Sequence, residues 1–402
     1  MRRRGRFIVP SPRRSIAIAM TFARIAALVA LLGAFASAAL ADEFLVGSNL
    51  PLSGGQARWG QEVADGLRLA ADAFNRSNAK HKIKLAIVDD EGNAAKAGAA
   101  AEKLIADGAV ALYGGFPTPA VVGAGNAATK AGIVYMSSGY GGTKADLKDF
   151  FQINAISGYQ KAMAGTMLAM GLKSVSLVHN TKEGSAYVAT TTAKALADRG
   201  VKVTMHPYDS AITDFKPIVN KIKLQDRPDA IAMVGYENEY IGMLRAAKVL
   251  KPDVKAIVCA YGLATPKMLA DFPAELQNVY GTTMLPFPPE FGTGEGKAFA
   301  AAFKEAYKKE PDYLAQFGYV SGQVLFDAIA RAADAGTIKK GGVAAELRKT
   351  DRDSLVGRVA FDETGFDPHF VLRMGQVQGD KIAVVWPPEH ATGKMRFPAL
   401  PW

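Results

Sequence analysis

The sequence predicts an α/β protein of two similar lobes, each a parallel sheet covered by helices. After an N-terminal export signal, short apolar runs alternate with helix-length segments, which is typical of parallel sheets with crossover helices. The alternation occurs in two successive series, separated by "FFQINAISG" (150–158), and a Pro-rich stretch at 279–291 ends the second series. A shared C-terminal region follows, so we expect two lobes rather than one continuous sheet.

The first 41 residues have the design of an export signal and are set aside. A basic start precedes the apolar run "IAALVALLGAFASAAL", and Ala39-Leu40-Ala41 offers a small-x-small cleavage site before Asp42. A second start at Met20 would leave a shorter signal of the same design. No Cys lies near the cleavage site, so no lipid anchor is expected. We predict a periplasmic protein, cleaved after Ala41.

Removing the signal changes the charge of the chain. The sequence has 48 Lys and Arg against 38 Asp and Glu, and the signal holds seven of the Arg and no acidic residue, which leaves 41 against 38. This near balance gives no indication of a nucleic-acid partner. No other segment reaches about 18 uninterrupted apolar residues, so we expect no further membrane span. Cys259 is the one cysteine, which excludes an intrachain disulfide, and its apolar surroundings predict a buried, inert thiol.

The first series predicts strands and helices in alternation. Strands are expected at 43–50, 82–90, 109–116 and 133–139, and helices at 59–75, 94–107 and after Pro119. The helix at 59–75 has a one-sided apolar stripe and ends near Asn75.

The second series continues the same rhythm. Helices are expected at 159–171, 185–200, 214–225 and 238–250, and strands at 174–180, 201–207, 230–236 and 256–262. Beyond the Pro-rich stretch we expect helices at 296–310 and 319–336 and a strand region between 357 and 389. The tail "GKMRFPALPW" has no period and is expected to lie irregularly on the surface.

The motifs that could indicate an enzyme are weak. Gly123 to Ala128 fits the dinucleotide pattern G-x-G-x-x-A, but Pro119 already suits a first helical turn, so both glycines fall inside a helix. Ser321 lies in "GYVSGQ", which is not a nucleophile motif, and the five His residues show no metal-ligand spacing. We therefore expect no catalytic residue, no metal and no cofactor.

Polar loops at strand ends indicate a binding edge, because open α/β sheets place ligands at the carboxyl ends of their strands. In "GGFPTPA", Thr118 is expected to cap a helix whose free amide groups favour an anion. The next strand end, "SSGYGG", brings Ser138 close to it, and Gly139 and Gly141 let a ligand approach the backbone. The alternative, left open by these residues alone, is ordinary turn and cap chemistry.

Four segments carry a resemblance to a known family: "VGSNLPLSGGQARWGQEVADGLRLAADAFN", "ALYGGFPTPAVVGAGNAATKAGIVYMSSG", "RPDAIAMVGYENEYIGMLRAA" and "VVWPPEHATGKMRFPALPW". They resemble the periplasmic substrate-binding proteins of branched-chain amino acid ABC importers, the type I periplasmic binding proteins. The resemblance implies two Rossmann-like lobes joined by three crossovers and closing on a ligand between them. It also implies membrane permease subunits as partners, no chemistry on the ligand, and a monomer. On this basis we assign 42–156 and 284–358 to the first lobe, 157–283 and 359–390 to the second, and 391–402 to the tail.

The resemblance also implies roles for individual residues. Trp59 stands where relatives place an aromatic ring against the ligand side chain, and Thr118 where a hydroxyl binds the α-carboxylate. Gly139 matches a position of backbone contacts, and Tyr236 lies near a second-lobe Tyr that closes over the ligand. Ser138 belongs to the same loop as Gly139 and is included in the expected site.

Three positions depart from the amino-acid pattern. Gly141 replaces a Thr that helps hold the α-ammonium, and Tyr261 stands where an acidic residue pairs with it. The second-lobe Tyr expected near Gly184 is absent, although Tyr187 could reach in from the next turn. An ammonium without an acceptor loses a charge-assisted bond worth about 1.5 to 3 kcal/mol. Glu237 or Glu239 could replace the lost acid.

The sequence therefore predicts an extracytoplasmic receptor of an ABC importer, with two alternative ligand classes. One is an amino acid, branched-chain or otherwise hydrophobic, and the other is a small carboxylate without an α-amine, such as an aromatic acid. A sensory binding module and an enzyme on the same fold are the less favoured alternatives.

Overall fold

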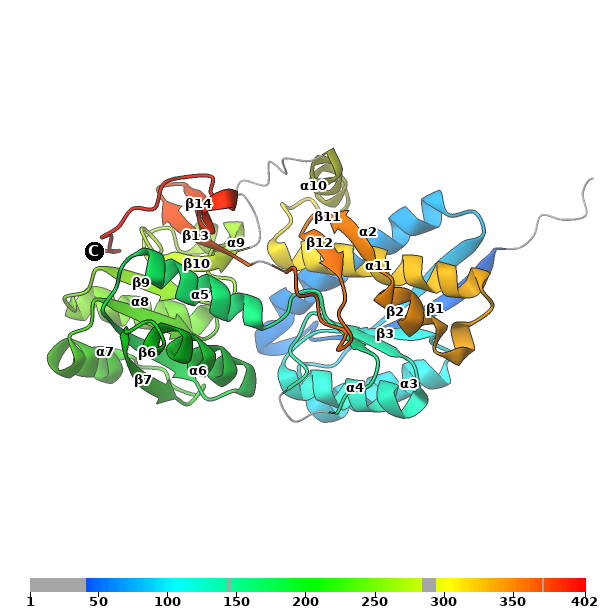
Figure 1. The fold of residues 1–402 in the computed structure, drawn as a ribbon, viewed down its shortest axis with the longest axis horizontal. Coiled ribbons are helices and arrows are strands. Elements are labelled where there is room, and N and C mark those ends of the chain that lie inside the picture. The colour runs from blue at the N-terminus through cyan, green and yellow to red at the C-terminus, as the bar shows by residue number, and fades with distance from the viewer. Residues whose placement is uncertain (1–40, 143–145, 284–293, 371) are drawn as a thin grey trace, which may run out of the picture.

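The computed structural model describes residues 41–142, 146–283, 294–370 and 372–402, so all of the predicted signal except Ala41 lies outside the described residues. The molecule is elongated, with two α/β lobes side by side along its longest axis (Figure 1). The short apolar runs of the sequence form the strands of the two sheets, and the helix-length segments cover the faces of these sheets. None of the helices in this part of the chain is long and apolar enough to span a bilayer.

The first lobe contains a five-stranded parallel sheet in the order β2-β1-β3-β4-β5. Its strands are β1 (Asp42–Leu50), β2 (His81–Asp89), β3 (Ala111–Gly114), β4 (Val134–Ser137) and β5 (Phe150–Phe151). All residues of β3 and β4 are buried, as expected for central strands covered on both faces. A 3-10 turn, η1 (Gly54–Gln56), leads from β1 into the first helix.

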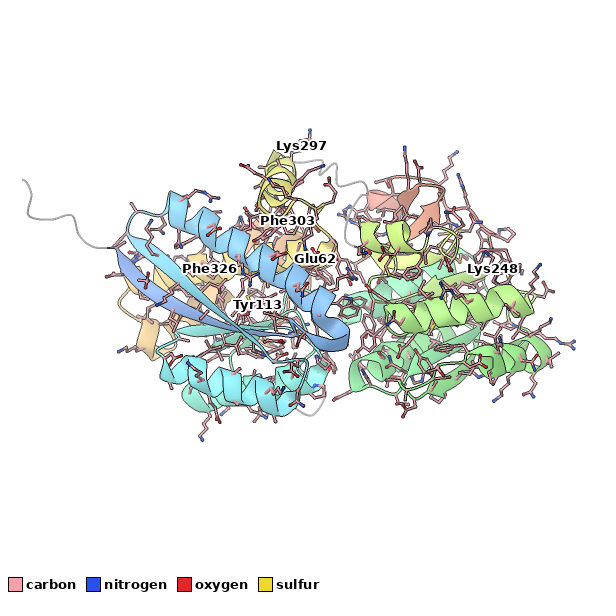
Figure 2. The ribbon with its side chains drawn as sticks, turned by 180° about the vertical axis from the view of Figure 1, so that it is seen from behind. Glu62, Tyr113, Lys248, Lys297, Phe303 and Phe326 are labelled. Atoms are coloured by element: carbon pink, nitrogen blue, oxygen red, sulfur yellow. The ribbon has the colours of Figure 1, made fainter. Side chains whose placement is uncertain are left out.

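Helices cover both faces of this sheet (Figure 1). One face carries α2 (Ala57–Ser77), α10 (Gly294–Tyr307) and α11 (Tyr313–Asp334), and the other carries α3 (Ala94–Ala106) and α4 (Thr118–Ala131). The helices α2 and α11 lie very close together, because both have glycine at the contact. A Cβ at Gly66 would stand 2.0 Å from the Ala315 carbonyl oxygen, and one at Gly318 would stand 2.2 Å from the Val63 carbonyl oxygen. Figure 2 shows Tyr113 of β3 inside this lobe and Glu62 on α2.

The second lobe contains a seven-stranded sheet in the order β14-β13-β10-β9-β8-β6-β7. Its strands are β6 (Ser174–Asn180), β7 (Lys202–Tyr208), β8 (Ala230–Val234), β9 (Ala256–Cys259), β10 (Tyr280–Thr283), β13 (Arg373–Gln378) and β14 (Lys381–Trp386). The first five run parallel, and β13 and β14 run antiparallel at one edge. The helices of this lobe are α5 (Ser157–Ala169), α6 (Glu183–Ala197), α7 (Lys216–Lys221), α8 (Glu237–Leu250) and α9 (Pro266–Asp271).

The chain passes between the lobes three times: from β5 to α5, from β10 to α10, and from β12 to β13. The first and third passages touch each other. The Gln152 amide donates to the Gly365 carbonyl (3.0 Å), and the Asp367 amide donates to the Gln152 carbonyl (3.1 Å). This short parallel bridge holds two of the three connections together.

Several elements differ from the sequence prediction. The helix expected at 319 begins at Tyr313, because the Asp312 carboxylate caps the amides of Leu314 and Ala315. The helix expected at 214–225 ends in a π-helical segment, η2 (Ile222–Asp226). Three short elements were not predicted: η3 (Ile338–Lys340), α12 (Gly342–Arg348) and β11 (Asp351–Ser354). β11 pairs with β12 (Gly357–Ala360), which begins the predicted strand region. The lobe boundary proposed after residue 358 falls inside β12.

The tail follows a last 3-10 turn, η4 (Pro388–His390), and contains no regular element. It lies against the second lobe, where the Tyr280 hydroxyl donates to the Arg396 carbonyl and the Ala399 amide donates to the Lys255 carbonyl (2.9 Å).

Candidate functional site

A cavity lies between the two lobes, where the carboxyl ends of both sheets meet. From the first lobe it is lined by residues that follow β3, such as Thr118, and residues that follow β4, such as Ser138. Tyr236 follows β8 and Tyr261 lies two residues after β9 in the second lobe. The cavity has a volume of about 60 Å³. This is room for a few waters or one small organic molecule.

Aromatic rings make a large part of the wall. Those that line the cavity are Trp59, Phe116, Tyr140, Tyr159, Tyr236, Tyr261 and Tyr313. Trp59 of the first lobe meets Tyr236 of the second with ring centroids 5.3 Å apart, and the Tyr236 ring stacks on Tyr261 at 6.1 Å. Trp59 also contacts Phe116 edge-on at 5.5 Å. The aromatic residue after the Ser/Gly loop therefore joins the two lobes at the cavity wall.

The polar part of the wall lies mainly in the first lobe and the first crossover. Its side chains are Gln56, Thr118, Ser138, Gln152 and Asn154. Among the described residues that line the cavity there is no Asp, Glu, Lys, Arg or His. The described lining of the cavity is thus formally neutral.

Thr118 does not cap α4, which corrects the sequence prediction. The N-cap position belongs to Pro117, and no side chain caps the helix there. Pro119 does lie in the first turn, as expected. The Thr118 hydroxyl is therefore available to the cavity beside the amino end of a helix, a position that favours an anionic group.

The loop after β4 is held in a fixed shape. The Tyr113 hydroxyl bonds to Ser138 Oγ, and the Gly139 amide donates to Ser137 Oγ (2.9 Å). A Cβ at Gly139 would stand 1.9 Å from the Gly115 carbonyl oxygen, so only glycine fits this close approach.

Six of the eight residues named in advance line the cavity together: Trp59, Thr118, Ser138, Gly139, Tyr236 and Tyr261. Gly141 and Tyr187 are not among the lining residues. Gly141 faces the packing beneath its loop, since a Cβ there would meet Phe150 at 3.2 Å. The Tyr187 ring packs on Tyr140, with centroids 5.2 Å apart.

The second-lobe phenols are half-buried donors. Burial raises the pKa of Tyr236 to about 12 and raises the pKa of Tyr261 well above its usual value. Both therefore keep their protons at neutral pH. The Tyr261 hydroxyl donates to the Gly184 carbonyl (3.0 Å), and a Cβ at Gly184 would lie 3.5 Å from Thr118 Oγ1. A larger residue at position 184 would occupy space next to Thr118.

The two acids considered as ammonium partners are engaged elsewhere. Glu237 pairs with Arg58 and accepts from Trp59 Nε1 (3.2 Å). Glu239 accepts from Asn180 Nδ2 (3.0 Å), the Tyr208 hydroxyl (2.8 Å) and the Tyr236 amide (2.7 Å). Neither lines the cavity.

Several lining residues were missed by the sequence analysis. Gln152 and Asn154 lie in "FFQINAISG", which was treated only as a boundary between the two series. Phe116 and Gln56 adjoin loops that were identified. Tyr313 was not predicted to line a site, because its helix begins earlier than expected.

No group of three or more His, Cys, Asp or Glu that could hold a metal ion occurs within the described ranges. A family model described as "Periplasmic binding protein" matches residues 44–381. The chain belongs to the periplasmic binding protein family. Members of this family are solute-binding proteins rather than enzymes.

Individual relatives agree with the family and differ in ligand. A leucine-, isoleucine-, valine-, threonine- and alanine-binding protein of Pseudomonas aeruginosa is 22% identical over 85% of this chain and 92% of its own length. A branched-chain amino acid transporter binding protein of Streptococcus pneumoniae, solved with isoleucine, has a TM-score of 0.73 and 24% identity, covering 86% of this chain and all of that one. A solute-binding protein of R. palustris, solved with benzoate, has a TM-score of 0.75 and 19% identity, covering 89% and 97%. The same fold thus serves both ligand classes in other proteins.

Proposed function

We propose that this protein is the extracytoplasmic receptor of an ABC importer for a small carboxylic acid without a free amino group. The observation that carries the ligand class is the neutral wall of the cavity, with aromatic rings on both sides and no acid among its described lining residues. A free ammonium placed there loses its water without gaining a carboxylate partner, which is costly in a desolvated site.

The carboxylate of the ligand has a suitable place beside Thr118. The hydroxyl lies at the amino end of α4, and the Tyr236 phenol of the second lobe remains a protonated donor. Such an arrangement favours negative over positive charge. Aromatic rings then accommodate the apolar body of the ligand, and their contacts from both lobes stabilise the closed state.

The importer role rests on the family and on relatives whose names describe ABC transporter binding proteins. We propose that the closed form docks on membrane permease subunits and releases the ligand there. An uptake assay tests this role: deleting the gene should abolish import of the ligand found in vitro, and unchanged import would contradict it.

A thermal-shift screen of the mature protein tests the ligand class. Leucine and valine form one arm, and benzoate and its simple analogues form the other. We expect stabilisation in the second arm. Stabilisation by leucine or valine, with none by the amine-free acids, contradicts the proposal.

A further inference from the structure

Two buried amide side chains of the first crossover line the cavity. Gln152 and Asn154 are 1% and 4% exposed. Gln152 Nε2 donates to the Gly139 carbonyl (3.0 Å), and Asn154 Nδ2 donates to the Ser138 carbonyl (2.7 Å). Each amide thus uses its nitrogen to hold the loop that follows β4.

These bonds fix which way the amides point. A backbone carbonyl can only accept, so the atom facing it must be the nitrogen in both side chains. The amide oxygens are therefore turned away from the loop. Among the described residues, Gln152 Oε1 is buried and has no hydrogen-bond partner, and Asn154 bonds to the loop through its nitrogen.

The two oxygens are held in place by the backbone as well. Their nitrogens bond the carbonyls of two adjacent residues, Gly139 and Ser138, so both side chains point to the same loop. The backbone of Gln152 is fixed on both edges by its bonds with Gly365 and Asp367. The pair is therefore a rigid acceptor site whose geometry exists before the ligand arrives.

We infer that the side-chain oxygens of Gln152 and Asn154 accept a hydrogen bond from a hydroxyl group of the ligand. The solute is then a hydroxylated carboxylic acid. This inference rests on the proposed function and narrows its ligand class. A buried acceptor without a donor is costly, and a ligand hydroxyl removes that cost. A neutral hydroxyl suits a neutral amide oxygen in a cavity whose lining carries no acid, whereas an ammonium would bring an unpaired charge.

Matched ligands test the inference by calorimetry. One series is 4-methylpentanoate, 2-hydroxy-4-methylpentanoate and leucine, which differ only at the α-carbon. The other is benzoate, 3-hydroxybenzoate and 4-hydroxybenzoate, so the two series distinguish an α-hydroxyl from a ring hydroxyl. In at least one series we expect the hydroxy acid to bind about tenfold more tightly than the unsubstituted acid.

Substitutions of the two amides test whether they cause the preference for hydroxy acids. Gln152→Met and Asn154→Leu keep the approximate size of each side chain and remove the acceptor, and the affinity ratio of hydroxy to unsubstituted acid should fall towards one. Both variants also lose a bond to the loop. Ser137→Ala is the matched control, because it removes the bond from the Gly139 amide to Ser137 Oγ without altering either amide oxygen. Its ratio should stay at the wild-type value.

Asn154→Asp provides a gain of function. It places a carboxylate in the cavity, and leucine should then gain affinity relative to the hydroxy acid.

The outcomes separate the two proposals. If hydroxylated and unsubstituted acids bind equally in both series, the inference is wrong and the proposed function stands. A ratio that collapses in Ser137→Ala as fully as in Gln152→Met also contradicts the inference. If none of these acids binds, or if leucine binds more tightly than all of them, the proposed ligand class itself fails.

Discussion

Arg58 of the first lobe and Glu237 of the second form a two-point ion pair beside the cavity. Arg58 Nε donates to Glu237 Oε2 (3.2 Å), and Arg58 Nη2 contacts Glu237 Oε1. Arg58 Nη1 also bonds to Asp312 (3.0 Å), at the start of α11. An acid that the sequence offers as an ammonium partner is thus used to join the lobes.

Replacing Arg58 by Ala should weaken ligand binding without unfolding either lobe. The pair is partly exposed, so its contribution is modest, and we expect an affinity loss of about three- to tenfold. Calorimetry measures the loss, and small-angle scattering should show a more open molecule. Lys248→Ala is the control, since Lys248 is an exposed cation on the same helix as Glu237 (Figure 2). An equal loss in both variants would exclude a specific role for the pair.

Trp59 has two roles that substitutions can separate. Its ring is 7% exposed and packs between Phe116 and Tyr236, and its Nε1 donates to Glu237. Trp59→Phe keeps a ring and loses the donor, so affinity should fall about two- to fivefold with little change in melting temperature. Trp59→Ala should lower affinity much further. A lower melting temperature with unchanged affinity would make Trp59 a packing residue only.

Gly139→Ala should disrupt the site more than Gly141→Ala. A Cβ at Gly139 would overlap the Gly115 carbonyl, whereas one at Gly141 would meet the Phe150 ring at 3.2 Å. We expect at least tenfold weaker binding for Gly139→Ala and a change of about twofold or less for Gly141→Ala. Similar effects of both substitutions on affinity would contradict this assignment.

The raised pKa of Glu62 should make the stability of the protein depend on pH. Burial raises its pKa from 4.5 to about 7, although Lys309 Nζ bonds to it (2.6 Å). Between these pH values the folded protein binds the proton more strongly than the unfolded chain, so this group makes stability fall as pH rises. Glu62→Gln should remove that part of the slope.

Melting temperatures of Glu62→Gln and wild type at pH 4.5 and pH 7.5 test this sign. The difference, variant minus wild type, should grow as pH rises, and Glu102→Gln, an exposed Glu on α3, serves as control. A difference that shrinks with rising pH would show that the pair with Lys309 outweighs the burial of Glu62.

The export prediction has a direct test. Mass spectrometry of the protein from a periplasmic fraction should give a mature chain that begins at Asp42, because cleavage is expected after Ala41. A chain retained in the cytoplasm with its N-terminal segment would contradict the localisation.

Local patterns in the sequence predicted most of the fold, because apolar periodicity and strand-end loops are short-range features. Strand-end loops placed Thr118 and Ser138 at the correct edge of the sheet, and the resemblance to the binding-protein family added Trp59 and Tyr236. Local patterns could not place Gln152 or Glu237, since the role of each depends on a partner in another part of the chain: the Gly139 carbonyl and Arg58. The start of α11 was missed because the Asp312 cap precedes the apolar stripe.

The central claim is that the cavity takes a carboxylate and excludes a free ammonium. Calorimetric titration of 4-methylpentanoate and leucine into the mature protein tests it most directly, because the two differ only in the α-ammonium. We predict tighter binding of the amine-free acid, by about tenfold or more. Tighter binding of leucine would contradict the claim.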